Sequence, residues 1–244
     1  MENYISKIIC GDCLEVMPSI PGKSIDMILC DLPYGTTACK WDTAIPFEPL
    51  WEQYKRIIKD NGAIVLTASQ PFTSALVMSN LKMFKYELIW DKLQGKQPML
   101  AHKRIMKSFE NILVFYKSQP IFNPQMREGN KYKDKRLGSN YSIHRGRTKP
   151  REMDYSGRFP LGVLAFPFTN TPNQHPTQKP VALFEYLIKT YTNENDLVLD
   201  NCAGSGTTGV ACKNLNRRFI LIEKEEKYCN DSRDRIDNTE EPLF

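Results

Sequence analysis

The sequence of 244 residues predicts a single α/β domain with a mostly parallel sheet and one large insertion. Short apolar runs bounded by turn residues alternate with segments of helical periodicity, as in strands joined by crossover helices. A polar stretch from Ser118 to Asn170, rich in Gly and Pro, interrupts this alternation. We therefore expect one hydrophobic core built from the two ends of the chain, with the stretch between them outside it.

The predicted strands are short and apolar, and they are Lys7–Cys10, Ser24–Cys30, Ala63–Ala68, Tyr86–Trp90, Ile112–Tyr116, Leu197–Asp200 and Arg218–Ile222. The predicted helices carry apolar residues at intervals of three and four, and they are Pro49–Lys59, Pro71–Asn80, Val181–Thr190, Thr207–Asn214 and Glu225–Arg235. The chain thus divides into residues 1–117, 118–170 and 171–244, of which the first and last share one domain.

Positive charge is concentrated in two parts of the chain, although the formal net charge is only +5. Residues 118–170 contain ten Lys and Arg against four Asp and Glu, and residues 92–107 contain five Lys and Arg and no acid. A basic region on an otherwise acidic chain is typical of a protein that binds a polyanion such as nucleic acid. The insertion is either a folded functional module or a segment that becomes ordered when it binds its ligand.

The composition also indicates where in the cell the protein is located and whether it binds a metal ion. No apolar run is long enough to span a bilayer, and the first residues lack the layout of a signal peptide. The seven cysteines are odd in number, and the Cys10-x-x-Cys13 pair has no second pair at a zinc-ribbon spacing. We expect a cytoplasmic protein with reduced thiols, no membrane contact and no bound metal.

A glycine-rich turn near the C-terminus predicts a cofactor site. The segment Ala203–Gly209 follows a predicted strand, opens a predicted helix, and places Gly204, Gly206 and Gly209 in a G-x-G-x-x-G spacing. Glycines there let the backbone turn tightly and approach a ligand, while the helix N-terminus offers N–H groups. The next strand leads to Glu223, whose carboxylate can accept hydrogen bonds from ribose hydroxyls. The pattern indicates an adenosine-containing cofactor, either a dinucleotide or S-adenosylmethionine.

A second segment, Asp31-Leu32-Pro33-Tyr34, stands at the C-terminal end of a predicted strand, where α/β sheets bind their ligands. The lone pair of a base's exocyclic amine is conjugated into the ring, so that nitrogen is a poor nucleophile. A carboxylate that accepts one N–H, with a backbone carbonyl accepting the other, favours the pyramidal nitrogen that attacks a methyl group. Proline restrains the backbone, and tyrosine offers a flat face to an extruded base. This chemistry needs no metal and favours S-adenosylmethionine over a dinucleotide.

The two segments resemble the amino-methyltransferase family of DNA modification enzymes, which methylate adenine N6 or cytosine N4. The family signature is an Asp/Asn/Ser-Pro-Pro-Tyr/Phe tetrapeptide and a Phe-x-Gly-x-Gly turn. Here the tetrapeptide comes first, as in the permuted beta group of the family. The resemblance implies a Rossmann-like, S-adenosylmethionine-dependent methyltransferase fold in circularly permuted order. Residues 1–117 would form its catalytic half, 171–244 its cofactor-binding half, and 118–170 an inserted target recognition region.

Two further segments carry the resemblance. Gly11-Asp12 is similar to the element whose carboxylate receives the cofactor's adenine amine. His175–Pro180 looks like the segment that closes over the methionine end of the cofactor. The resemblance thus implies a set of cofactor-binding residues, namely Asp12, Lys179, Cys202, Gly204, Ser205, Gly206, Thr207 and Glu223.

The chain departs from the family pattern at two positions. Leu32 replaces the first proline of the tetrapeptide, which leaves its carbonyl available but held less rigidly. Cys202 replaces the phenylalanine that packs against the cofactor, so either the cofactor binds more loosely or another apolar side chain compensates. Asp31 at the first position favours adenine, because cytosine-specific members of the family more often carry serine.

We therefore expect transfer of a methyl group from S-adenosylmethionine to adenine N6 in double-stranded DNA, with base flipping and direct in-line transfer. The predicted catalytic residues are Asp31, Leu32, Pro33 and Tyr34. The predicted DNA contacts are the basic side chains Lys92, Lys96, Lys103, Arg104, Lys107, Arg127, Lys131, Lys133, Lys135, Arg136, Arg145 and Arg147. Cytosine N4 methylation, an acceptor in RNA or protein, and a catalytically silent DNA-binding module remain alternatives. The oligomeric state, monomer or homodimer, also stays open.

Overall fold

A computed structural model describes residues 5–35, 43–96, 98–129, 132–136, 151–155, 157–168 and 178–239. The chain divides into two compact units. The main unit comprises residues 1–123 and 162–244, and the small unit comprises residues 124–161. The small unit thus lies within the predicted insertion, which begins and ends several residues outside it.

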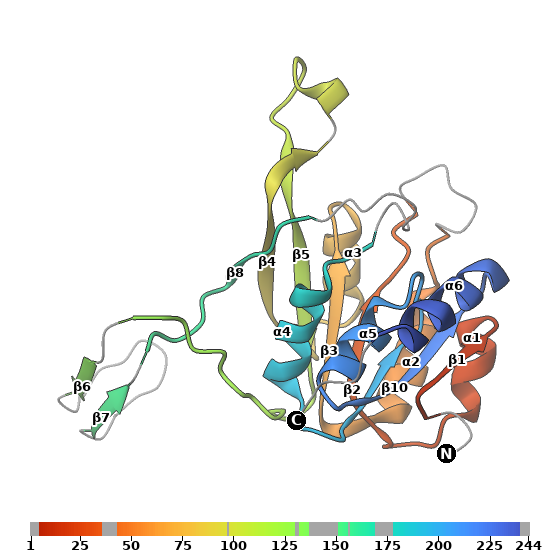
Figure 1. Ribbon diagram of the computed structural model, residues 1–244, viewed down its shortest axis with the longest axis horizontal. Coiled ribbons are helices and arrows are strands. Elements are labelled where there is room, and N and C mark those ends of the chain that lie inside the picture. Colours follow the sequence, from red (N-terminus) through yellow and green to blue (C-terminus); the bar gives the residue numbers. More distant parts are fainter. Residues whose placement is uncertain are drawn as a thin grey trace. The chain divides into compact units, whose positions relative to one another are not determined.

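The main unit is built on one eight-stranded sheet (Figure 1). Its strands, in spatial order, are β1 (Lys7–Cys10), β10 (Arg218–Glu223), β9 (Leu197–Asp200), β2 (Ile25–Asp31), β3 (Ile58–Ala68), β5 (Lys107–Phe115), β4 (Phe84–Lys96) and β8 (Val163–Ala165). Neighbouring strands are parallel except where β5 pairs with β3 and with β4. The prediction of an α/β fold with a mostly parallel sheet is confirmed.

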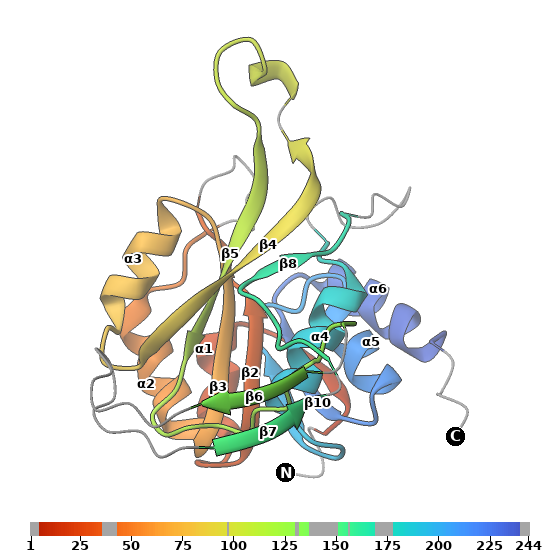
Figure 2. The ribbon, with the colours of Figure 1, turned by 90° about the vertical axis from the view of Figure 1, so that its left-hand side faces the viewer.

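Helices cover both faces of this sheet (Figures 1 and 2). One face carries α1 (Cys13–Val16), α2 (Phe47–Ile57) and α3 (Phe72–Ser79), and the other carries α4 (Val181–Tyr191), α5 (Thr207–Asn214) and α6 (Glu226–Asp237). Two single 3-10 turns, η1 (Met17–Ser19) and η2 (Pro98–Leu100), complete the helical elements.

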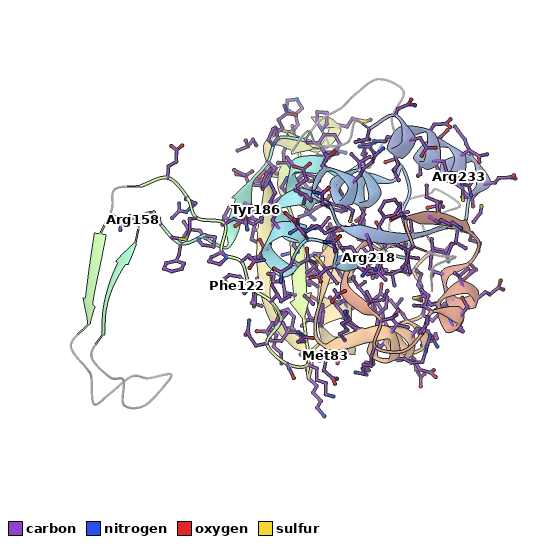
Figure 3. The ribbon with its side chains drawn as sticks, turned by 60° about the horizontal axis from the view of Figure 1, so that its bottom comes forward. Met83, Phe122, Arg158, Tyr186, Arg218 and Arg233 are labelled. Atoms are coloured by element: carbon purple, nitrogen blue, oxygen red, sulfur yellow. The ribbon has the colours of Figure 1, made fainter. Side chains whose placement is uncertain are left out.

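The central strand β2 shows why the sheet needs this double cover. Ile28 and Cys30 belong to the core on one face, while Met27 and Leu29 belong to the core on the other, and all four are fully buried. A parallel strand buried on both sides reads as a continuous apolar run, and this is why the sequence predicted it. Side chains crowd the main unit throughout, and Tyr186, labelled in Figure 3, packs edge-on against Phe166.

The strand order predicts which edge of the sheet can bind a ligand. From β2 the chain proceeds through α2 to β3, whereas from β9 it proceeds through α5 to β10, in the opposite direction along the sheet. Because β2 and β9 are neighbours, their carboxyl ends meet where the winding direction reverses. Such a switch point leaves a crevice in which α/β sheets bind ligands.

The antiparallel hairpin of β4 and β5 was not predicted, although a short piece of each strand was. The two strands continue beyond the ends of their neighbours and project from the sheet (Figure 2). Their pairing is interrupted between Asp91 and Lys96, where Leu93 adopts a left-handed backbone with φ of 58°. This polar, basic extension carries no alternation of apolar residues, so periodicity could not find it.

The small unit contains a two-stranded antiparallel sheet of β6 (Tyr132–Arg136) and β7 (Arg151–Tyr155). Arg127 and Arg158 pair as an isolated bridge at its base, and Arg127 Nε donates to the carbonyl of Phe159 at 3.1 Å. The predicted insertion therefore contains regular structure, in keeping with a folded module, although neither strand was predicted. Within the described residues, no helix is both long and apolar enough to span a bilayer.

Candidate active site

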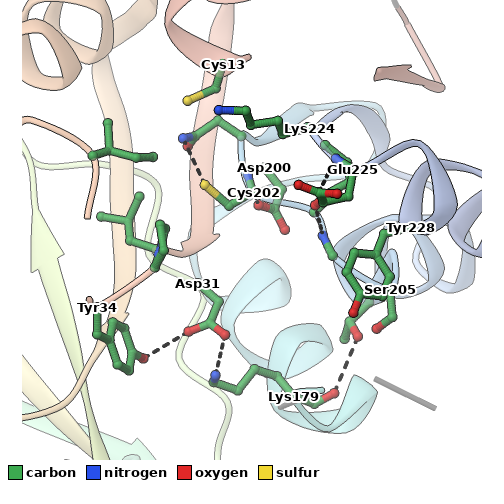
Figure 4. A pocket seen from close by; sticks show the side chains of 18 of the residues that line it. Cys13, Asp31, Tyr34, Lys179, Asp200, Cys202, Ser205, Lys224, Glu225 and Tyr228 are labelled. Atoms are coloured by element: carbon green, nitrogen blue, oxygen red, sulfur yellow. Dashed lines mark hydrogen bonds and ion pairs between the residues drawn. The ribbon is translucent and has the colours of Figure 1, made fainter. Parts of the chain in front are cut away.

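A cavity of about 500 Å³ opens at the carboxyl ends of β1, β2, β9 and β10. The catalytic turn, Asp31–Tyr34, lines it from the end of β2. The glycine turn, Ala203–Gly206, faces the same cavity from the end of β9 through Ala203, Gly204 and Ser205. Two segments that are about 170 residues apart in the chain thus share one cavity (Figure 4).

Asp31 is the most heavily engaged carboxylate in the cavity. Its Oδ1 accepts hydrogen bonds from the Tyr34 hydroxyl at 2.9 Å and from the Thr67 hydroxyl of β3. Its Oδ2 accepts from the ammonium group of Lys179 (Figure 4). These contacts from both sides orient the carboxylate within the cavity.

Lys179 belongs to a buried chain of alternating charges. Its ammonium group lies 3.5 Å from Glu110 Oε2, and Glu110 Oε1 accepts from Lys92. Burial alone would lower the pKa of Lys179, but the carboxylates of Asp31 and Glu110 raise it above its ordinary value. Burial likewise opposes ionisation of Glu110, but the ammonium groups of Lys179 and Lys92 hold its pKa below the usual range. Lys179 and Glu110 therefore both stay charged at neutral pH.

Tyr34 presents its hydroxyl to Asp31 and rests its ring on Phe72, at a centroid distance of 5.2 Å and an interplanar angle of 28°. Burial and the negative charge of Asp31 raise the pKa of Tyr34 well above its ordinary value. The phenol therefore remains a neutral hydrogen-bond donor to Asp31.

The glycine turn depends on backbone conformations that favour glycine. Gly204 has a φ of 51° and Gly206 a φ of 74°, both in the left-handed region. Glu223 supports the turn, because its Oε2 accepts from the Gly204 amide at 2.8 Å and its Oε1 accepts from the Glu225 amide at 2.9 Å. Ser232 donates to the Gly204 carbonyl at 2.6 Å. The turn presents backbone and a carboxylate, rather than bulky side chains, to the cavity.

Asp200, which ends β9, is buried between the two turns. It accepts hydrogen bonds from the Cys202 amide at 3.0 Å and from the Thr208 hydroxyl. Burial raises the pKa of Asp200 to about 6, despite these hydrogen bonds. At neutral pH it is therefore an ionised acceptor that ties the start of the glycine turn to α5.

Cys202, the departure from the family phenylalanine, lines the cavity next to Cys13. Hydrogen bonds with the thiols of Cys13 and Cys30, together with burial, raise the pKa of Cys202 well above its ordinary value. It is therefore a neutral thiol. Leu14 and Tyr228 also line the cavity and can supply the apolar surface that the phenylalanine would have supplied.

The two remaining segments of the resemblance also reach the cavity. Asp12 lines it, caps α1 by accepting from the Leu14 amide at 2.9 Å, and lies 3.5 Å from the ammonium group of Lys224. Gln178 accepts from the Ser205 hydroxyl at 3.0 Å and so joins the segment before α4 to the glycine turn. His175, Pro176 and Thr177 lie outside the described residues.

Nearly every predicted cofactor residue lines the cavity. Gly206 does not, because it caps α5 and its α-carbon faces Ser232 instead. The residues fit an adenosine-containing cofactor, since they combine a glycine turn at a helix N-terminus with a carboxylate at the end of the next strand. No group of three His, Cys, Asp or Glu suited to a metal ion occurs among the described residues.

The predicted DNA contacts divide into three groups. Lys103, Arg104 and Arg127 are exposed, and Lys107 is half-buried beside Ser69. The prediction that Lys92 contacts DNA is wrong. Its side chain is buried in the cavity wall as the partner of Glu110 and offers no surface to a phosphate. Side chains of the remaining predicted contacts lie outside the described residues, namely Lys96, Lys131, Lys133, Lys135, Arg136, Arg145 and Arg147.

Sequence reasoning missed one wall of the cavity, formed by Trp90, Glu110 and Phe168. The rings of Trp90 and Phe168 are stacked at 6.4 Å, with Lys92 4.9 Å from the Trp90 centroid. Glu110 was the available signal, since an acid directly before a buried strand is unusual and needs a partner.

The fold and the cavity together define an S-adenosylmethionine-dependent methyltransferase of the Rossmann-like class. Residues 25–234 match the DNA methylase family of N6 and N4 methyltransferases, so the chain belongs to that family. It is a DNA methyltransferase, and the prediction of S-adenosylmethionine as its cofactor is confirmed.

Several known proteins resemble the chain over nearly its whole length. The type II methyltransferase M.HinfI of Haemophilus influenzae is 29% identical, with 97% of this chain and 69% of that protein covered. The type II methyltransferase M.HpaI of Haemophilus parainfluenzae is 28% identical, with coverages of 95% and 74%. The crystal structure of an M1.HpyAVI–SAM complex is 28% identical and superposes with a TM-score of 0.65, covering 94% and 98% of the two chains. A cytosine-N4-specific PvuII DNA methyltransferase shares the fold, with a TM-score of 0.68, 16% identity and coverages of 96% and 93%.

Proposed function

We propose that this DNA methyltransferase transfers a methyl group to the N6 amine of adenine in double-stranded DNA. The observation that carries the proposal is the shared cavity, in which Asp31 and Tyr34 face the glycine turn. A nucleophile held at one turn and a methyl donor held at the other are then close enough for direct transfer.

Asp31 is the acceptor that activates the amine. Tyr34 and Thr67 hold Oδ1, which leaves Oδ2, on the side of Lys179, to accept an N–H of the target amine. The carbonyl of Leu32 or Pro33 accepts the second N–H, so that the nitrogen lone pair points toward the methyl group. The methylated nitrogen carries one proton too many, and Asp31 is placed to take it.

The cofactor, when bound, supplies an electrophilic methyl group on a sulfonium centre. Glu223 is suited to its ribose hydroxyls, since its carboxylate is already oriented by the Gly204 and Glu225 amides. Asp12 is suited to the adenine amine from the neighbouring strand β1. The glycine turn allows close approach of the backbone at the centre of the cavity.

The target base has to leave the duplex stack, because a paired base cannot enter a cavity of this kind. Trp90 and Phe168 give that cavity an aromatic wall, and Tyr34 contributes a further ring. Basic side chains outside the cavity, including Lys103 and Arg104, are suited to the phosphates of the duplex. A cytoplasmic location fits this substrate.

Adenine is favoured over cytosine by the aspartate at the first position of the tetrapeptide. Cytosine N4 methylation is the second candidate, because the same cavity and the same acceptors serve either amine. A catalytically silent DNA-binding protein is a poorer fit, because Asp31 and Tyr34 are engaged in one hydrogen-bonded arrangement inside the cavity.

Mass spectrometry of nucleosides tests these candidates together. DNA is incubated with the protein and S-adenosylmethionine carrying a labelled methyl group, and then digested to nucleosides. We expect labelled N6-methyladenine. Labelled N4-methylcytosine would replace the proposal by the second candidate, and an unlabelled digest from protein that binds both DNA and cofactor would identify a silent module.

A further inference from the structure

The projecting tip of the β4–β5 hairpin exposes large apolar side chains. Met99 is 91% exposed and Ile105 is 96% exposed, the two highest values among the large hydrophobic residues of the described chain. Met106, by contrast, packs against Gly95 across the hairpin and so supports the hairpin itself. Met99 and Ile105 therefore have no packing role in the main unit, and exposed apolar side chains grouped at a tip indicate an interaction site.

The charge around these two side chains indicates the chemistry of the partner. Residues 92–107 contain five Lys and Arg and no acid. Lys103 and Arg104 are exposed on the tip itself, between Met99 and Ile105 in the chain. An apolar tip whose own charged residues are all positive is suited to nucleic acid, where phosphates meet the cations and unstacked bases meet the apolar groups.

The hairpin also connects the tip directly to the cavity. Trp90 and Lys92 on β4, and Glu110 on β5, line the cavity, and the same two strands then continue into the tip. Ile105 precedes Glu110 by five residues, which places it roughly 16 Å along an extended strand from the cavity wall. A paired β-ribbon of this kind fits a groove of DNA. The irregular pairing at Leu93 stands where the cavity wall becomes the projecting tip.

We propose that Met99 and Ile105 enter the duplex beside the target base and fill the space that the base leaves when it turns into the cavity. The proposal rests on the proposed function, because it needs a base that leaves the stack. Apolar wedges between bases stabilise the unstacked duplex, so the tip favours the extrahelical base. The tip then acts on base extrusion, while Asp31 acts on the methyl transfer that follows.

The test compares paired and unpaired targets. The recognition site is first located by sequencing DNA that the wild-type protein has modified. Single-turnover methylation at saturating protein is then measured on a duplex with this site intact, and on the same duplex with an abasic site opposite the target base. We expect the M99A/I105A variant to be at least about tenfold slower on the intact duplex and within about threefold of wild type on the abasic one.

Two matched variants separate the wedge from general effects. M78A/L81A removes two other exposed apolar side chains, 67% and 56% exposed at the end of α3, and should stay within about twofold of wild type on both duplexes. M99L/I105L keeps apolar side chains at the tip and should restore the rate on the intact duplex to within about threefold.

Three results would overturn the proposal. M99A/I105A could slow both duplexes equally, which would assign the tip to a step common to both rather than to base extrusion, or it could slow neither. Sedimentation could also show a wild-type dimer that M99A/I105A converts to a monomer, which would assign the tip to a second copy of the chain. Failure of the proposed function itself is distinct, since the wild-type protein would then label no DNA of either kind, or would label cytosine in place of adenine.

Discussion

The two turns that face each other across the cavity are held in different ways. The catalytic turn is held through side chains, since Asp31 is bonded to Tyr34, Thr67 and Lys179. The glycine turn is held through its backbone, since the Gly204 amide donates to Glu223 and the Gly204 carbonyl accepts from Ser232. One turn therefore presents a fixed functional group, and the other presents an accessible surface.

This difference assigns separate tasks to the two turns. A fixed carboxylate is suited to transition-state stabilisation, which depends on preorganised polar groups. A glycine backbone supported by a carboxylate is suited to holding a cofactor, which depends on close approach. Changes at the catalytic turn should therefore alter the rate of transfer, and changes at the glycine turn should alter cofactor affinity.

The largest effect is expected at Asp31. D31A removes the acceptor of the amine and should lower the methyl-transfer rate by about 10²–10³-fold or more, as losses of preorganised polar groups do. The dissociation constant of S-adenosylmethionine, measured by calorimetry, should change by less than about threefold. D31N, which keeps the shape and one acceptor oxygen, should lie between D31A and wild type. Near wild-type transfer by D31A would remove the catalytic turn from the mechanism.

The converse effect is expected at Glu223. E223A removes a charged acceptor and should raise the dissociation constant of S-adenosylmethionine by about 10–100-fold, because hydrogen bonds to charged groups contribute about 1.5–3 kcal/mol. The transfer rate at saturating cofactor should fall by less than about threefold. E223Q keeps an oxygen for the Gly204 amide and should be affected less. A loss of rate without a loss of affinity would contradict the separation of tasks.

Lys179 tests the comparison most sharply, because it contacts the catalytic turn and also the first residue of α5, directly after the glycine turn. Its ammonium group bonds to Asp31, while its backbone carbonyl lies 3.5 Å from the Thr207 hydroxyl behind the glycine turn. K179M should lower the transfer rate about tenfold and leave cofactor affinity within about threefold of wild type, because the side chain orients Asp31.

The control for Lys179 is K189M, an exposed lysine at the end of α4, which should match wild type in both measurements. A large loss of cofactor affinity in K179M, with an unchanged rate, would instead return Lys179 to the cofactor site that the sequence predicted.

The smallest effect is expected at the exposed charges of the hairpin. K103A/R104A should reduce the slope of log affinity for DNA against log salt concentration by about 2, since each neutralised phosphate contributes about 0.9. K55A/K82A, which removes two exposed lysines near the opposite ends of the strands, should leave the slope unchanged. An unchanged slope in K103A/R104A would place the DNA backbone elsewhere on the protein.

Helices and strands could be predicted from the sequence where an apolar segment ends at a clear turn signal. The strands β1 and β9 and the helix α5 have the predicted bounds, because each is a short segment with apolar residues next to a glycine or aspartate turn. The extended ends of β4 and β5 could not be read, because their residues pair through the main chain and carry no apolar alternation. The sequence also could not show that the Lys92 side chain points into the cavity. Successive strand residues point to opposite faces, and its partner, Glu110, lies on another strand.

The residues of each turn, and the chemistry they suit, were already present in the linear order of the chain. Asp31-Leu32-Pro33-Tyr34 and the glycine turn are short contiguous segments, so their residue types and spacing can be recognised without any tertiary contact. Their meeting is a tertiary property, because it requires β2 and β9 to pair side by side with their helices on opposite faces of the sheet. Lys179, just before α4, reaches Asp31 at the end of β2 from 148 residues away in the sequence, and a hydrogen bond over such a separation follows from packing rather than from local propensity.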